Sequence, residues 1–173
     1  IGFIFQDPMT SLTPHLKIGD QLAEIAIYHK KINKNKALKR ALEVMDIVKL
    51  PSNRDIINAY PHELSGGMKQ RIMIAISLMC EPDLIIADEP TTALDVTTQA
   101  EILSIFNDLK NNLNIGLVLI SHNIGVIAET SNDVLVMKDG QILESGETIK
   151  VLTKPKNEYT KHLLSCIPPW IGN

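Results

Sequence analysis

The sequence Leu64-Ser65-Gly66-Gly67-Met68-Lys69-Gln70-Arg71 places two adjacent glycines before an apolar-periodic run over residues 72–79. Serine is a favoured helix N-cap, so we expect a helix to begin at Ser65. A glycine-rich helix start exposes backbone N–H donors that another surface can approach closely, which suits an anion. For Ser-Gly-Gly alone, an ordinary capped helix is the simpler interpretation. The full eight residues are far more specific.

The composition indicates one domain with an aliphatic core and excludes several function classes. The chain has 173 residues, of which 45% are apolar and only 4% aromatic, and its length allows a sizeable core. A formal net charge of −3 gives no sign of the excess positive charge that is typical of nucleic-acid-binding domains. The two cysteines form no CxxC pattern and fit a reduced, cytosolic compartment. No stretch approaches the roughly 18 apolar residues of a membrane span.

Upstream of these eight residues, the chain predicts one strand and then a helical region. The apolar residues 1–5 are typical of a short buried strand, which ends at Gln6 in a loop that contains two prolines. Helical periodicity then covers residues 19–28 and 35–48, while 51–61 is expected to be irregular. Because no strand interrupts them, these helices are predicted to form one all-helical insert.

Downstream, continuous apolar strands alternate with amphipathic helices. We expect strands at residues 84–87 and 115–120, a helix at 96–113 capped by Asp95, and a helix at 124–129. A hairpin about Asp139-Gly140 is expected to follow. This alternation predicts an α/β fold with a mostly parallel sheet that is covered on both faces.

Three predicted strands end in polar side chains: Gln6 after the first, Asp88 and Glu89 after the second, and His122 after the third. Ligands of open α/β sheets bind at the carboxyl ends of strands, so these groups are expected to share one edge. Each has an ordinary interpretation alone: a loop amide, a turn cap or a hydrogen-bonded core histidine. Together they favour a catalytic site.

The chemistry of these four side chains fits phosphoryl transfer to water. Such transfer needs Mg²⁺, an oriented water and donors for the phosphate charge. We expect Asp88 to hold Mg²⁺, with Gln6 touching both the ion and the water. Glu89 is then the general base, and His122 donates to the γ-phosphate and orients Glu89. Two adjacent carboxylates repel each other without a cation, so the pair itself argues for a metal.

The motifs resemble, in order, those of an ATP-binding cassette (ABC) nucleotide-binding domain, a P-loop NTPase-like fold. Gln6 resembles the Q-loop, residues 64–70 the signature, 84–89 the Walker B strand, 93–95 the D-loop and Ser121-His122 the H-loop. The strings 5–12, 60–63 and 158–164 are similar to the peptide/nickel importer subfamily. One departure is Asn123, where aspartate more often follows the histidine.

The resemblance implies an ATP-hydrolysing subunit that energises an importer of di- or oligopeptides or nickel. The implied partners are a second ABC ATPase subunit, identical or different, membrane permease subunits and, indirectly, a solute-binding protein. The resemblance also implies a peripheral membrane subunit, located on the cytoplasmic face of the cell membrane. Across the ATPase pair, the nucleotide would be met by five residues, Ser65, Gly66, Gly67, Gln70 and Asp95.

One expected element has no counterpart in this sequence. None of the nine glycines lies in a G-x-x-x-x-G-K-[ST] pattern, so the P-loop that cradles the phosphates is absent. The simplest interpretation is a segment without its first strands and Walker A, inactive alone. The expected domains are a partial ATPase domain at 1–148, with a helical part at 15–81 and a core at 1–14 and 82–148, and the start of a C-terminal extension at 149–173.

Two alternatives to the importer ATPase stay open. The chain is then either a non-catalytic remnant that pairs only through its signature face, or a soluble ABC ATPase outside transport. An upstream P-loop in frame would favour the enzyme over the remnant. The strings at residues 6–12 and 159–164 argue against the soluble ATPase, because they match the transporter subfamily.

Overall fold

The computed structural model describes residues 1–7, 11–51, 54–92 and 94–166. The chain divides into two compact units, Ile1–His122 and Asn123–Asn173. Residues 8–10 of the subfamily string 5–12, Ala93 of the predicted D-loop and residues 167–173 of the predicted extension lie outside the described residues. The family domain boundaries expected from the sequence stay a prediction.

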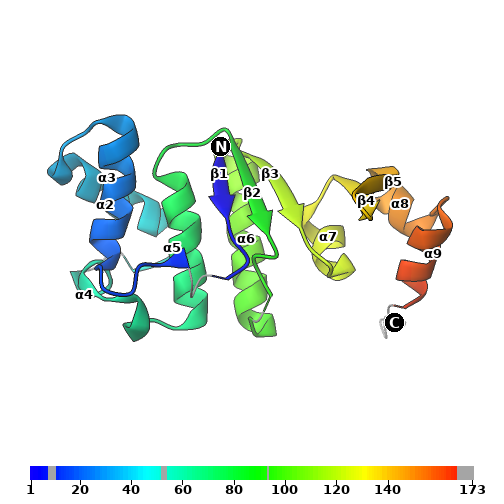
Figure 1. Ribbon diagram of the computed structural model, residues 1–173, viewed down its shortest axis with the longest axis horizontal. Coiled ribbons are helices and arrows are strands. Elements are labelled where there is room, and N and C mark those ends of the chain that lie inside the picture. The colour runs from blue at the N-terminus through cyan, green and yellow to red at the C-terminus, as the bar shows by residue number, and fades with distance from the viewer. Residues whose placement is uncertain (8–10, 52–53, 93, 167–173) are drawn as a thin grey trace. The chain divides into compact units, whose positions relative to one another are not determined.

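The first unit contains a parallel sheet, as the sequence predicts, and its strand order is β1-β2-β3 (Figure 1). The strands are β1 (Gly2–Ile4), β2 (Leu84–Asp88) and β3 (Gly116–Ile120). The register pairs Ile4 with Ala87 and Asp88 with Ile120, so all three carboxyl ends lie at the same edge. That edge carries the predicted catalytic side chains.

The helices of the first unit follow the predicted periodicity, with one exception. They are α2 (Ile18–Lys30), α3 (Lys34–Ile47), α4 (Arg54–Asn58), a 3₁₀ turn at Pro61–Glu63, α5 (Gly66–Leu78) and α6 (Val96–Leu113). The described residues between β1 and β2 form no strand, which confirms the all-helical insert.

The exception is α4, because the prediction of irregular chain over residues 51–61 was wrong. This five-residue helix packs against α2. Ile56 is only 8% exposed, and the Ile57 side chain lies where a Cβ on Gly19 would fall, 2.5 Å away. The Ile18 N–H also donates to the Ala59 carbonyl, with an N–O distance of 2.9 Å. Tertiary packing therefore forms a helix that is too short to show periodicity.

Among the described residues of the first unit, helices cover one face of the sheet. The expectation that helices cover both faces was wrong. Helix α5 packs on β1 and α6 on β3, over a face where Ile4, Ile85 and Ala87 have no exposed surface. On the other face, Phe3 and Val118 are 42% and 46% exposed. Both crossovers run in the same direction along the sheet, and right-handed crossovers of that kind put their helices on one side.

The described part of the second unit, residues 123–166, contains three helices and an antiparallel hairpin. Its elements are α7 (Ile124–Thr130), β4 (Asp133–Lys138), β5 (Gln141–Glu147), α8 (Thr148–Thr153) and α9 (Glu158–Ser165). The hairpin turns at Asp139-Gly140 as predicted, and both residues have positive φ, 50° and 76°. Within the described residues, no helix has both the length and the apolar character that crossing a membrane requires.

Candidate functional site

Glu89 occupies a tight turn directly after β2, with a left-handed φ of 44°. Such a backbone is unfavourable for a residue with a side chain, by roughly 1 kcal/mol. Two main-chain hydrogen bonds hold it. The Glu89 N–H donates to the Ile120 carbonyl at the end of β3 (2.9 Å), and the Thr92 N–H donates to the Glu89 carbonyl (3.1 Å). The turn thus fixes Glu89 at the sheet edge.

Three side chains from separate parts of the sequence surround the Glu89 carboxylate. Gln6, just beyond β1, donates from Nε2 to Oε2 (3.1 Å), and the Thr92 hydroxyl donates to the same oxygen (2.9 Å). His122, just beyond β3, places Nδ1 2.8 Å from the other oxygen, Oε1. The structure therefore brings together Gln6, Glu89 and His122, the three side chains predicted to be catalytic.

The hydrogen bonds around Glu89 favour its ionised form. The bond with His122, followed by that with Thr92, holds the pKa of the Glu89 carboxyl below its usual range. The Glu89 side chain is 23% exposed and that of His122 is 72% exposed, so both can reach a molecule at the edge. An ionised, accessible carboxylate can accept a proton from a water molecule.

Asp88, the last residue of β2, is half-buried and directly precedes Glu89. Its carboxylate and the Gln6 amide oxygen are the kinds of donor that Mg²⁺ prefers. No group of three or more His, Cys, Asp or Glu among the described residues is placed to hold a metal alone. This donor set fits Mg²⁺, which keeps several waters and binds through one or two protein oxygens together with substrate phosphates.

The predicted signature begins helix α5, with Ser65 as its N-cap. The Ser65 hydroxyl accepts from the Met68 N–H at 3.3 Å, which confirms the expected cap. Gly66 is the first helical residue, and a Cβ built on it would have its nearest neighbour, a Leu94 methyl carbon, only at 4.0 Å. Gly66 therefore leaves the start of the helix open.

Gly67 has a packing role that the sequence did not reveal. A Cβ on Gly67 would fall 2.5 Å from the Thr98 methyl carbon, so only glycine lets α5 lie this close to α6. Thr98 is held in turn by Asp95, the N-cap of α6. The Asp95 carboxylate accepts from the Thr98 N–H (2.9 Å) and hydroxyl (2.7 Å). The predicted signature and D-loop residues thus meet through Thr98.

Gln70 is placed differently from the other predicted nucleotide contacts. It is only 2% exposed, and its amide nitrogen has no hydrogen-bond partner. Gln70 therefore lies inside the first unit, while Gly66 lies at an open helix start. A contact between Gln70 and nucleotide stays a prediction.

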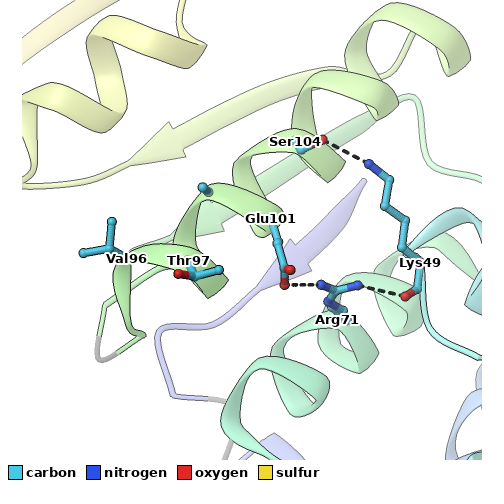
Figure 2. A pocket seen from close by; sticks show the side chains of 7 residues that line it. Lys49, Arg71, Val96, Thr97, Glu101 and Ser104 are labelled. Atoms are coloured by element: carbon cyan, nitrogen blue, oxygen red, sulfur yellow. Dashed lines mark hydrogen bonds and ion pairs between the residues drawn. The ribbon is translucent and has the colours of Figure 1, made fainter.

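Arg71 connects α5 to its neighbours beside a hollow of about 670 Å³ (Figure 2). Its guanidinium donates to the Lys49 carbonyl (2.8 Å) and pairs with Glu101 of α6 (2.5 Å), and its side chain is 14% exposed. Lys49 reaches α6 as well, pairing with Asp108 (2.7 Å) and donating to Ser104 (3.0 Å). The Arg71–Glu101 pair therefore ties the signature helix to α6, and the Lys49 bonds tie the segment between α3 and α4 to α6.

Sequence reasoning gave no role to Thr92, Thr98 or Arg71. A signal for Thr92 was present, because it lies three residues after Glu89 in a turn sequence that contains Pro90. Arg71 was visible only as the end of the signature string. Thr98 had no signal, since its closeness to Gly67 depends on how two helices pack.

Comparisons with known proteins agree with this geometry. Residues 1–92 match the ABC transporter family. The oligopeptide transport ATP-binding protein OppD of Salmonella typhimurium is 46% identical over 168 residues, 97% of this chain and 50% of that protein. The oligopeptide transport ATP-binding protein AppD of Bacillus subtilis is 48% identical over 168 residues, 97% of this chain and 51% of that protein. The chain spans about half the length of these curated relatives.

Solved structures give the same fold. CbiO1 from Clostridium perfringens, part of an ABC transporter complex, superposes with a TM-score of 0.78 at 27% identity, over 88% of this chain and 59% of that one. The ATP-binding cassette MJ0796, in a dimer bound to ADP and Pi, gives a TM-score of 0.72 at 30% identity, over 85% and 62%. The described α/β sheet and helices are those of an ABC cassette, and the chain belongs to the ABC transporter family.

Proposed function

We propose that this sequence is part of an ATP-hydrolysing subunit that energises an ABC importer of peptides. The observation that carries the proposal is the Glu89 carboxylate, ionised, partly exposed and surrounded by Gln6, Thr92 and His122 at the carboxyl edge of the sheet. The oligopeptide and dipeptide transport subunits among its relatives support the choice of solute.

In the proposed reaction, Glu89 accepts a proton from the water that attacks the γ-phosphate of ATP. His122, with its ring largely exposed, donates to the γ-phosphate, where negative charge accumulates. Asp88 and Gln6 would hold Mg²⁺, which when bound neutralises phosphate charge. Glu89 thus holds the proton taken from the water, and His122 also orients the Glu89 carboxylate.

The start of α5 has a separate role in the proposal. The open N-terminus at Ser65, Gly66 and Gly67 offers backbone N–H donors to the γ-phosphate held by a second ATPase subunit. Asp95 would cross the same interface, and a contact from Gln70 would need it to leave its buried position. Membrane permease subunits and a solute-binding protein complete the proposed assembly at the cytoplasmic face of the membrane.

The test is Glu89→Gln in the whole protein, assembled with its partner subunit. We expect phosphate release to fall by at least about 100-fold, because the amide cannot accept the proton. Binding of a fluorescent ATP analogue should change little. Glu129→Gln on the exposed surface of α7 is the matched control and should keep normal turnover. Retained turnover in Glu89→Gln would exclude Glu89 as the base.

The solute is tested separately, with the assembled transporter in vesicles. Di- and oligopeptides presented with the binding protein should raise the rate of ATP hydrolysis. Stimulation by nickel instead would replace the peptide assignment and leave the hydrolase assignment intact.

A further inference from the structure

The three donors around Glu89 differ in what else they are expected to do. Under the proposed function, Gln6 also turns toward Mg²⁺ and the attacking water, and His122 toward the γ-phosphate. Each of these two side chains then divides its polar atoms between Glu89 and the nucleotide site, because the amide and the imidazole each carry a second polar atom. Thr92 is given no contact with Mg²⁺ or nucleotide, and its hydroxyl donates to Oε2 of Glu89 at 2.9 Å.

We propose that Thr92 is the positioning residue that holds Oε2 of Glu89 when nucleotide engages Gln6 and His122. This inference rests on the proposed function. Oε1, which faces His122 in the structure, is then the oxygen that accepts the proton of water. As that proton moves to Oε1, the water oxygen bonds to the γ-phosphorus and the bond to the ADP oxygen breaks.

The local backbone gives Thr92 a fixed place relative to Glu89. Its N–H donates to the Glu89 carbonyl (3.1 Å), so both its main chain and its side chain bond to the same residue. Pro90 between them restricts the turn, and β-branching restricts the Thr92 side chain. Gln6 and His122 follow other strands, 83 and 33 residues from Glu89 in sequence, so no short turn fixes their distance from it.

The neighbouring threonine helps to identify the active hydroxyl. Thr91 is only 6% exposed, so it lies within the first unit, whereas Thr92 is exposed at the sheet edge. Within this Thr-Thr pair, Thr92 is the accessible residue, and its hydroxyl donates to the Glu89 carboxylate. The Thr92 hydroxyl is therefore the group to test.

The first test is ATP hydrolysis by the whole protein with Thr92→Val, Thr92→Ser and a control, Thr153→Val. Thr153 is also exposed and donates only to a helix carbonyl, so its variant should keep normal rates. Removing one hydrogen bond to a carboxylate should lower kcat about 10-fold in Thr92→Val and change KM by less than about 2-fold. Thr92→Ser, which keeps the hydroxyl, should restore kcat to within about 2-fold.

A second readout does not depend on activity. In the 173-residue chain with ¹³C-labelled glutamate, Thr92→Val should shift the carboxyl NMR signal of Glu89, and Thr92→Ser should not. Circular dichroism verifies that each variant is folded, and Thr92→Ala replaces Thr92→Val if the valine variant does not fold.

The outcomes separate this inference from the proposed function. Normal kcat in Thr92→Val, with Glu89→Gln inactive, would overturn the role of Thr92 alone. An equal loss in Thr92→Ser and Thr92→Val would also overturn it, because the hydroxyl would not be the cause. Normal turnover in Glu89→Gln would instead overturn the proposed function, whatever Thr92 does.

Discussion

The edge around Glu89 and the start of α5 are built in opposite ways. At the edge, side chains from three separate segments converge on one partly exposed carboxylate. At the start of α5, one continuous stretch supplies the cap and the glycines, and buried or half-buried contacts fix it against α6. The edge is therefore held by polar bonds that can open, while the helix start depends on packing that cannot change without cost.

This difference predicts where substitutions act. Changes at the edge should alter turnover while the chain stays folded, as Glu89→Gln and Thr92→Val are designed to show. Substitutions of residues that hold α5 and α6 in place should alter the free energy of unfolding. Three further substitutions test the second half of that contrast.

Arg71→Met should have the largest effect on stability. It removes a guanidinium that is 14% exposed and leaves the Lys49 carbonyl and the Glu101 carboxylate without their donor. We expect the free energy of unfolding to fall by about 2–3 kcal/mol, measured by urea denaturation of the chain. Lys49→Met is the matched control. Its ion pair with Asp108 is nearly half exposed on both sides and should contribute less than about 1 kcal/mol.

Equal losses in Arg71→Met and Lys49→Met would contradict this contrast. The bonds of Arg71 would then stabilise α5 no more than a surface ion pair does.

Gly67→Ala should have the next largest effect. Its new methyl group would meet Thr98, whose hydroxyl is fixed by Asp95, so α5 and α6 must separate slightly. Overpacking of this kind costs about 1–3 kcal/mol. Gly66→Ala, with no atom nearer than 4.0 Å, should change the free energy of unfolding by less than about 0.5 kcal/mol.

A double-mutant cycle identifies the cause of the Gly67 effect. Thr98→Ser removes the methyl group that Gly67 faces and keeps the hydroxyl, so Gly67→Ala should cost much less in that background. An unchanged cost would mean that the alanine clashes elsewhere.

Much of this arrangement could be predicted from the sequence, for a physical reason. Ser65 and Asp95 are caps whose hydrogen bonds reach only three residues ahead, so local sequence is enough to find them. Glu89, Gln6 and His122 were predicted to meet because each directly follows a strand of the same sheet.

What the sequence did not reveal depends on tertiary contacts or on backbone geometry. Helix α4 has only five residues and exists because Ile56 and Ile57 pack on the helical region. The uncovered sheet face follows from the direction of the crossovers, which strand patterns alone do not contain. The turn sequence after Glu89 hinted at Thr92, but its bond to the carboxylate depends on the left-handed turn that places the hydroxyl there.

Asp95→Asn should give the smallest effect, a loss of stability at neutral pH that shrinks as the pH falls. The hydrogen bond from the Thr98 N–H holds the pKa of the Asp95 carboxyl below its usual range in the folded chain. Asp95 therefore adds stability at any pH above its ordinary, unfolded pKa, and this contribution disappears as the pH falls through the folded pKa. Asparagine also caps a helix but does not titrate in this range, so the variant lacks this acid-sensitive contribution.

The measurement is the urea midpoint of the chain and of Asp95→Asn, at neutral pH and at steps into the acid range. We expect the original chain to be the more stable of the two at neutral pH and the difference to shrink on acidification. Asn123, the uncharged cap of α7, already shows that an asparagine can cap in this protein, with its side-chain oxygen 3.0 Å from the Gly125 N–H. A difference that stayed constant or grew on acidification would mean that the ionised form of Asp95 does not stabilise the folded chain.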